Sequence, residues 1–303
     1  MSTLNSTDFA RMFSCPADDL SDSVLDMIWS KDWTHQVLEG LELSAVVNDL
    51  NSRLAQLNKA DSGTERWDLG WKENLDNYKS TGDLKALDPR YIRPNQPLRL
   101  HSQFIKAKER DFELNWYKVF RQWFFSNFLS GYRTIYEFGS GSGHNLPFLC
   151  EMFPMAEVHA LDWSIPAIEI AEELRRRLRI NVTGRRFDLF NPDGELAPNS
   201  AVLTVGVIEQ TGTKWPSFLE WLIDQKPGIV CHIEPIVEWY YPDNVVDRTA
   251  IDAHCVRGFQ TGYVEALRER QREGRIRILR THRTGFGSMV TEGYSQLIWE
   301  VVR

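Results

Sequence analysis

The stretch Glu137-Phe138-Gly139-Ser140-Gly141-Ser142-Gly143-His144 carries three glycines at alternate positions. A short apolar run at residues 134–138 leads into it, and a helical pattern at residues 145–153 follows it. Because glycine has no Cβ, the chain can turn tightly here and a ligand can come close to the backbone. A glycine-rich turn between a strand and a helix is typical of nucleotide-binding α/β folds, although one such turn alone is weak evidence.

Strand and helix patterns alternate from residue 130 to the end of the chain. We expect strands at residues 134–138, 157–161, 184–187, 201–205, 229–233, 276–281 and 296–302, and helices at residues 145–153, 166–178, 215–225 and 251–272. This alternation predicts the α/β class, with a doubly wound, mostly parallel seven-stranded sheet covered on both faces. The last two strands have no helix between them, so we expect an antiparallel closing strand.

Residues 1–129 differ from the rest and are interpreted as helices and loops. Apolar residues recur at helical spacing in residues 21–29, 34–57 and 104–129. Residues 61–100 are polar and rich in turn formers. We expect two parts, a helical cap or lid at residues 1–129 and a ligand-binding catalytic domain at residues 130–303, with a homodimer interface as the competing role of the first part. Candidates for the surface of the lid are Trp67, Trp71, Tyr78, Tyr117 and Arg121.

The composition restricts the class of protein. The 303 residues carry a net charge of −7, with 42% hydrophobic and 25% charged residues, which is ordinary for a soluble globular protein. An acidic surface repels phosphates, so we expect a small-molecule substrate and no nucleic acid. No long apolar run and no apolar leader occurs, so we expect a cytoplasmic protein without a membrane span. The four cysteines lack CxxC spacing, which argues against a disulfide framework and a zinc cluster.

Two acids end later strands of the predicted sheet. Asp162 follows the second strand, about 20 residues beyond the glycine loop, where a carboxylate can bind ribose hydroxyls. Asp188 ends the third strand, where a carboxylate can accept a hydrogen bond from an adenine amino group. Each acid has a plainer interpretation, Asp162 as a helix N-cap and Asp188 as an exposed loop acid.

The spacing of the glycines separates two classes of nucleotide site. A nicotinamide site uses G-x-G-x-x-G, which would place its third glycine at position 144, where this chain has His144. Glu137, just before the loop, would repel a pyrophosphate and suits a ligand with an amine or a positive centre. Both features disfavour an NAD-dependent oxidoreductase.

At these residues the chain resembles the class I S-adenosylmethionine (SAM)-dependent methyltransferases. Residues 137–143 match the family's (D/E)-x-G-x-G-x-G motif, and residues 201–209 are similar to its fourth-strand segment. The resemblance covers about residues 130–303 and implies a Rossmann-like methyltransferase fold with SAM as the cofactor. It implies cofactor contacts at Glu137, Gly139, Ser140, Gly141, Gly143, Asp162, Trp163, Asp188, Leu189 and Gly206. Gln210 stands where many small-molecule members of the family carry a histidine.

Candidate catalytic residues lie in and after the fifth strand. Alternation places His232 and Glu234 on one side of this strand, and we expect them to converge with Gln210 as a general base or substrate clamp. The alternative is that His232 and Glu234 are a buried, hydrogen-bonded polar pair. His254 could complete a two-histidine, one-carboxylate iron site, but oxygenases of that kind are β-barrels, and we expect no metal. His144 either faces the cofactor or has a structural role.

These patterns predict a SAM-dependent methyltransferase that acts on a hydroxyl or amine of a small organic acceptor in small-molecule biosynthesis, with O-methylation slightly favoured. A non-catalytic SAM-binding regulator or partner subunit is the first alternative, since intact cofactor residues do not prove turnover. An NAD-dependent oxidoreductase is the weaker one.

Overall fold

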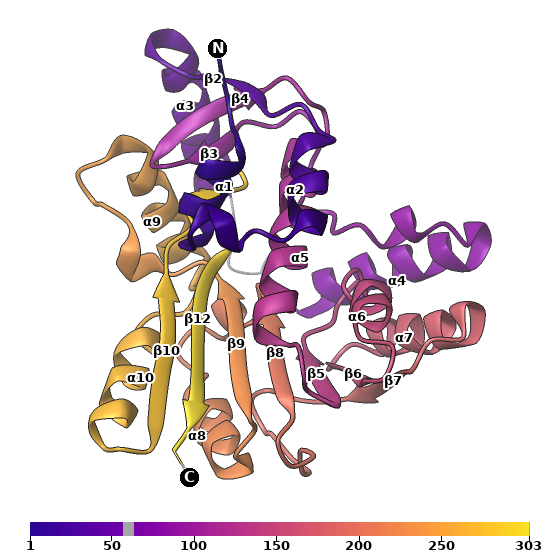
Figure 1. Ribbon diagram of the computed structural model, residues 1–303. Helices are drawn as coiled ribbons and strands as arrows, with labels where there is room; N and C mark the ends of the chain where they lie inside the picture. Colours follow the sequence, from indigo (N-terminus) through magenta and orange to yellow (C-terminus); the bar gives the residue numbers. More distant parts are fainter. Residues whose placement is uncertain (57–63, 303) are drawn as a thin grey trace.

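The computed structural model describes residues 1–56 and 64–302. A seven-stranded sheet in the order β10-β12-β9-β8-β5-β6-β7 forms its centre (Figure 1). The strands are β5 (Thr134–Phe138), β6 (Glu157–Asp162), β7 (Val182–Arg186), β8 (Ala201–Val205), β9 (Ile229–Glu234), β10 (Ile276–His282) and β12 (Ser295–Val301). Strand β12 runs antiparallel to both of its neighbours, and the pairs among β5 to β9 are parallel. The predicted α/β fold with an antiparallel closing strand is therefore confirmed.

Two hydrophobic clusters cover the two faces of the sheet, because successive residues of a strand point to opposite sides. Ile135 of β5 packs into one cluster with α5 and α7, whereas the next residue, Tyr136, packs into the other with α8 and α10. The covering helices are α5 (Phe112–Phe128), α6 (Leu146–Met152), α7 (Ile165–Leu178), α8 (Pro216–Gln225) and α10 (Tyr263–Arg272). Nowhere in residues 1–56 and 64–302 does a helix have the length and apolar character needed to cross a membrane.

The N-terminal part contains a second sheet that the sequence did not predict. Its order is β1-β2-β4-β3-β11. The strands are β1 (Ser2–Thr3), β2 (Thr34–Val37), β3 (Leu98–Leu100), β4 (Gln103–Ala107) and β11 (Phe286–Gly287). The helices expected at residues 34–57 and 104–129 therefore begin later than predicted, and strands occupy the first residues of each range. Strands of four or five residues are too short to show a clear period. Since β11 comes from the C-terminal part, this sheet joins the two predicted parts.

Two further helix predictions need correction. Residues 64–81, within the segment expected to be turns, form α4 (Thr64–Thr81), a polar helix that packs on α7. The single helix expected at residues 251–272 is two helices, α9 (Val245–Arg257) and α10, because Gly258 and Gly262 between them have φ angles of +64° and +82°. The remaining helices are α1 (Ser6–Phe13), α2 (Asp22–Trp29), α3 (Gly40–Gln56), and the 3-10 turns η1 (Ala17–Asp19), η3 (Leu84–Leu87), η4 (Ile208–Thr211) and η5 (Val237–Trp239).

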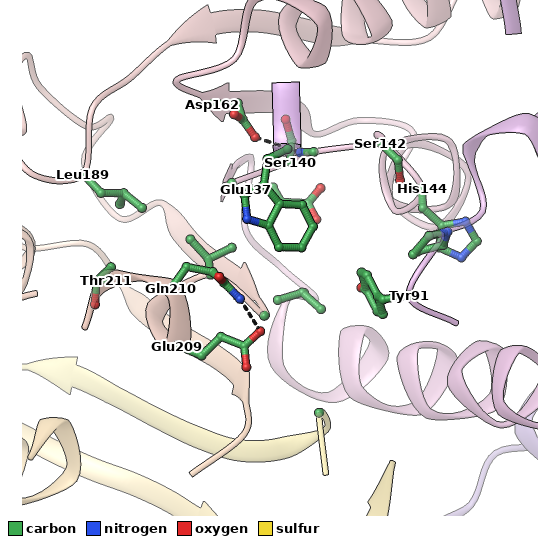
Figure 2. Close-up of a pocket in the computed structure, with 18 of the residues that line it drawn as sticks. Tyr91, Glu137, Ser140, Ser142, His144, Asp162, Leu189, Glu209, Gln210 and Thr211 are labelled. Carbon is green, nitrogen blue, oxygen red and sulfur yellow. Dashed lines mark hydrogen bonds between the residues drawn. The ribbon is translucent and has the colours of Figure 1, made fainter. Parts of the chain in front are cut away.

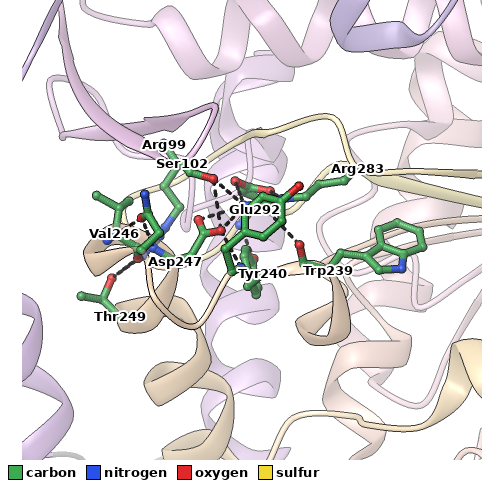
Figure 3. Close-up of polar contacts among 11 residues, drawn as sticks. Arg99, Ser102, Trp239, Tyr240, Val246, Asp247, Thr249, Arg283 and Glu292 are labelled. Carbon is green, nitrogen blue, oxygen red and sulfur yellow. Dashed lines mark hydrogen bonds and ion pairs between the residues drawn. The ribbon is translucent and has the colours of Figure 1, made fainter.

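A buried ionic network holds the segment between β10 and β12 against the N-terminal part (Figure 3). Arg283 donates to Glu292 at 2.6 and 2.8 Å and to Asp247 of α9 at 2.8 Å. Arg99 of β3 is fully buried and donates to the Val246 carbonyl at 2.6 Å. Two guanidinium groups thus balance two carboxylates, which makes their burial tolerable.

Candidate functional site

A cavity of about 490 Å³ lies at the carboxyl ends of β5, β6 and β8. The direction of the strand order reverses between β5 and β8, and ligands of open α/β sheets bind at such a point. Every predicted cofactor contact except Gly143 lines this cavity, and so does Gln210. Figure 2 shows Leu189 and His144 at opposite ends of the cavity and Glu137 between them.

The glycine loop has a backbone conformation that favours glycine. Gly139 and Gly143 have φ angles of +67° and +70°, in the left-handed region. A Cβ on Gly139 would overlap the Val207 side chain, and one on Gly143 would lie 2.7 Å from the Ile170 side chain. Both glycines are therefore required because a neighbouring side chain packs against the position that a Cβ would occupy.

Asp162 crosses from the end of β6 to the glycine loop. Its Oδ2 accepts a hydrogen bond from the Gly141 N–H at 2.9 Å, and its Oδ1 accepts one from the Ser164 N–H at 2.9 Å. Burial raises the pKa of this carboxyl to about 6, although the backbone donors oppose the shift. Ser164, not Asp162, occupies the N-cap position of α7. Asp162 thus fixes the loop and also lines the cavity.

Glu137 places an unpaired carboxylate oxygen in the cavity wall. The side chain is 2% exposed, and its Oε1 accepts a hydrogen bond from Asn145 Nδ2 at 2.8 Å. Its Oε2 has no partner among the described residues. Burial raises the pKa of Glu137 to about 7. A buried oxygen without a donor costs about 1–3 kcal/mol, so this site fits a ligand that donates from an ammonium group.

The other end of the predicted cofactor site is more open. Trp163, Asp188 and Leu189 line it. Both carboxylate oxygens of the exposed Asp188 accept hydrogen bonds locally, from the Phe190 N–H at 2.8 Å and Asn191 Nδ2 at 2.9 Å. The side-chain hydrogen bond from Asn191 is the main reason why the pKa of Asp188 is lowered. Its local role is therefore to hold the turn after β7.

His232 and Glu234 lie behind the cavity wall rather than in it. His232 is fully buried, with Nδ1 2.8 Å from Thr204 Oγ1 and Nε2 2.9 Å from the Tyr263 hydroxyl. Glu234 accepts hydrogen bonds from Thr204 Oγ1 at 2.7 Å and from the Val207 N–H at 3.0 Å. Burial lowers the pKa of His232 to about 3 and raises that of Glu234 to about 7.

The expected convergence of this pair with Gln210 is therefore wrong. The side chain of Gln210 is exposed and donates to Glu209 Oε1 at 2.7 Å. His232 faces α10 because alternation along β9 directs it toward Tyr263 and Trp299. His254 is buried on α9 against the rings of Tyr240 and Phe259. Within residues 1–56 and 64–302, no three His, Cys, Asp or Glu side chains are grouped to hold a metal ion.

The rest of the wall comes from regions without a recognisable motif. Of the aromatic candidates from the N-terminal part, Trp67, Trp71 and Tyr117 line the cavity. The rings of Trp67 and Trp71 stack at 5.4 Å, and Trp71 lies directly over Gly141. The cavity is also lined by five residues for which the sequence predicted no ligand contact, namely Tyr91, Glu113, Glu209, Arg257 and Tyr294. Only Glu209 had a signal, since it belongs to the fourth-strand segment.

The cavity has an acidic character. Five carboxylates and two guanidinium groups line it, namely those of Glu113, Glu137, Asp162, Asp188, Glu209, Arg186 and Arg257. Burial, together with the charge of Glu234, raises the pKa of Glu209 to about 8, and burial raises that of Glu113 to about 7. A cation in the cavity would stabilise the ionised forms of these carboxyl groups, so a positively charged ligand is favoured over an anionic one.

Comparison with solved structures finds distant similarities of fold. A SAM-dependent methyltransferase from Aquifex aeolicus aligns over 56% of this chain and 82% of that one, with 17% identity and a TM-score of 0.39. Human N-acetylserotonin methyltransferase, in complex with SAM, aligns over 57% and 48%, with 13% identity and a TM-score of 0.40. The [4+2]-cyclase SpnF aligns over 56% and 60%, with 13% identity and a TM-score of 0.44. The alignments span less than two thirds of the last two proteins.

No family model and no curated protein matches the sequence. The assignment of the fold therefore rests on the features of this chain. Its features are the order of the seven strands, the single antiparallel strand β12, the glycine loop after β5 and the acid that ends β6. The glycine loop, the acid and the antiparallel closing strand were expected from the sequence, and the order of the strands comes from the structure. Together they give the chain the Rossmann-like fold of the class I SAM-dependent methyltransferases.

Proposed function

We propose that this protein transfers a methyl group from SAM to a hydroxyl or amine of a small organic acceptor. The observation that carries the proposal is the buried, unpaired Oε2 of Glu137 beside the glycine loop. SAM has an α-ammonium group that can donate to this oxygen, and its sulfonium supplies an electrophilic methyl group. The pyrophosphate of a dinucleotide would instead bring negative charge to the carboxylate.

The residues of the cavity divide between the two ligands. Asp162 would hold the ribose, Trp163 and Leu189 would contact the adenine, and the loop from Gly139 to Gly141 would accommodate the methionine part. The remaining wall, with Tyr91, Glu113, Glu209, Gln210 and Arg257, would receive the acceptor. A cavity of about 490 Å³ shared with the cofactor suits a small acceptor better than a macromolecule. We place this activity in small-molecule biosynthesis in the cytoplasm.

We propose a supporting role for His232 and Glu234. Glu234 accepts from the backbone N–H groups of Val207 and Glu209, at 3.0 and 3.3 Å, and thereby fixes the loop after β8. His232 in turn is linked to Glu234 through Thr204. The pair would then act on the acceptor wall through the position of Glu209, without touching either ligand.

A thermal-shift measurement tests the cofactor part of the proposal. S-adenosylhomocysteine (SAH) at about 100 times its Kd should stabilise the native state by about 2.7 kcal/mol, because it binds only that state. NAD and ATP serve as controls and should leave the melting temperature unchanged. Stabilisation by NAD, with no response to SAH, would contradict the proposal and favour an oxidoreductase.

Turnover is tested separately with methyl-labelled SAM and a panel of small phenols, aliphatic alcohols and amines. Transfer of label to any member of the panel supports the enzyme. A chain that binds SAH tightly and transfers label to none of them favours the alternative, a SAM-binding regulator or partner subunit.

A further inference from the structure

His144, the residue after the glycine loop, lines the cavity, and one of its ring nitrogens is paired while the other is buried without a partner in the described part of the chain. Its Nδ1 lies 3.2 Å from Oδ1 of Asp88, and its side chain is 9% exposed. Its Nε2 has no hydrogen-bond partner in the described part of the chain. His144 lines the same cavity as Glu137, at the end opposite Leu189 (Figure 2).

The orientation of this ring is set by the protein itself. Arg121 Nη1 donates to the His144 carbonyl at 3.1 Å, and the ring of Tyr117 stacks on the imidazole at 5.9 Å. Asp88 is held in turn, because Ser142 Oγ donates to the carbonyl of its neighbour Leu87 at 2.7 Å. The glycine loop, η3 and α5 together fix the imidazole between the cofactor site and the N-terminal part.

The contact with Asp88 selects the tautomer. An ionised carboxylate can only accept a hydrogen bond, so Nδ1 must carry the proton and Nε2 keeps its lone pair. Burial is the main cause that lowers the pKa of His144 below 6.5, and the nearby cations Arg121 and Lys118 lower it further, whereas Asp88 raises it. The imidazole is therefore neutral at neutral pH, and its acceptor nitrogen has no partner in the described part of the chain.

We propose that His144, oriented by Asp88, is the general base that removes the proton from the acceptor. This inference rests on the proposed methyltransferase function. As the acceptor's O–H or N–H bond breaks, its proton bonds to Nε2, its heteroatom bonds to the methyl carbon, and the C–S electron pair stays on sulfur. The imidazolium then releases the proton to water, which regenerates the base.

A competing role for His144 is to bind the carboxylate of the cofactor. That role needs a proton on Nε2, and since Asp88 keeps the proton on Nδ1, it needs the imidazolium. Burial and the two neighbouring cations disfavour that form. The two roles therefore differ in protonation state and in their effect on cofactor affinity.

NMR of the histidine ring nitrogens, on the full chain saturated with SAH, distinguishes these roles without an acceptor. The His144→Gln variant identifies the His144 signals by their loss. We expect a neutral ring protonated at Nδ1 at neutral pH, and loss of this preference in Asp88→Asn. A ring protonated at Nε2, alone or as imidazolium, would overturn the assignment.

The second test is kinetic. It uses, as the acceptor substrate, the phenol, alcohol or amine of the panel that accepts label fastest. His144→Gln should lower kcat about 100- to 10,000-fold and leave the Kd of SAH unchanged. Asp88→Asn should lower kcat in the same direction, and His159→Gln, whose ring lies outside the cavity wall, should not. A rise in the Kd of SAH without a fall in kcat would overturn the base. If the wild-type chain binds no SAH, the proposed function itself fails. If it binds SAH but the NMR or kinetic result contradicts the expectation, only the role of His144 fails.

Discussion

The glycine-loop side of the cavity comes from residues 137–163, whereas the opposite wall collects residues that are scattered along the chain. Glu137 and Asp162 are 25 positions apart and belong to adjacent strands. Tyr91, Glu113, Arg257 and the segment before β12 meet only through the tertiary fold. The first side is fixed by local turn geometry and the second by long-range packing. Mutations should therefore affect cofactor binding and overall stability in different proportions at the two places.

The largest expected effect is a loss of stability at Arg283, in the segment before β12, which long-range packing holds in place. Arg283→Ala leaves Asp247 and Glu292 buried without their cation, which should lower the free energy of unfolding by about 3–5 kcal/mol. Urea denaturation measures this loss. Arg277→Ala, which removes an exposed ion pair with Glu300, is the matched control and should cost about 0–1 kcal/mol. Equal losses in the two variants would show that the network does not hold this wall.

The next effect is on the glycine-loop side. Asp162→Ala should weaken SAH binding by about 1.5–3 kcal/mol, the range for a lost hydrogen bond to a charged group. This corresponds to roughly a 10- to 150-fold rise in Kd. Titration calorimetry measures it, with the exposed Asp193→Ala as control. An unchanged affinity in a folded Asp162→Ala variant would show that Asp162 only holds Gly141 in place and does not contact the cofactor.

Substitution of Glu234, which lies behind the cavity wall, should affect the stability of the fold rather than the affinity for the cofactor. Glu234→Ala leaves two backbone N–H groups and the Thr204 hydroxyl without their acceptor, and should lower stability by about 1–3 kcal/mol. The folded fraction should keep normal affinity for SAH. Melting temperature, affinity and turnover are compared with those of the exposed Glu195→Ala. Unchanged stability with lost turnover would restore the catalytic role that the sequence suggested.

The smallest effect is a pH dependence at Glu137. Its raised pKa of about 7 means that the carboxyl gains a proton as the pH falls through that value. The neutral form attracts an ammonium group less, so the affinity for SAH should fall by up to about tenfold per pH unit below this point. Glu137→Gln should bind more weakly and show a flatter profile. An identical profile in both proteins would assign the dependence to another group.

The sequence predicted the parts of the site that depend on local backbone geometry. The three glycines and the acids at the strand ends carry their meaning in spacing, because left-handed turns and strand ends recur in fixed places. The strands β2, β3 and β4 escaped prediction because they are short and their partners are distant in sequence. His232 was placed in the site because alternation gives the face of a strand but not what covers that face.

The acceptor wall could not be predicted for the same reason. Arg257 ends a helix, Tyr91 lies in a loop and Glu113 lies in the first turn of a helix, and none of these positions has a local signal for ligand binding. His144 is an intermediate case. Its place after the glycine loop was visible, but its partner Asp88 is 56 positions earlier, and only the fold brings the two together.

Calorimetric titration of the purified chain with SAH tests the central claim most directly, namely that this cavity is a SAM site organised around Glu137. We predict one SAH bound per chain at neutral pH, weaker binding in both Glu137→Gln and Asp162→Ala, and no heat of binding with NAD. Binding of NAD but not SAH, or SAH binding that neither substitution changes, would contradict the account.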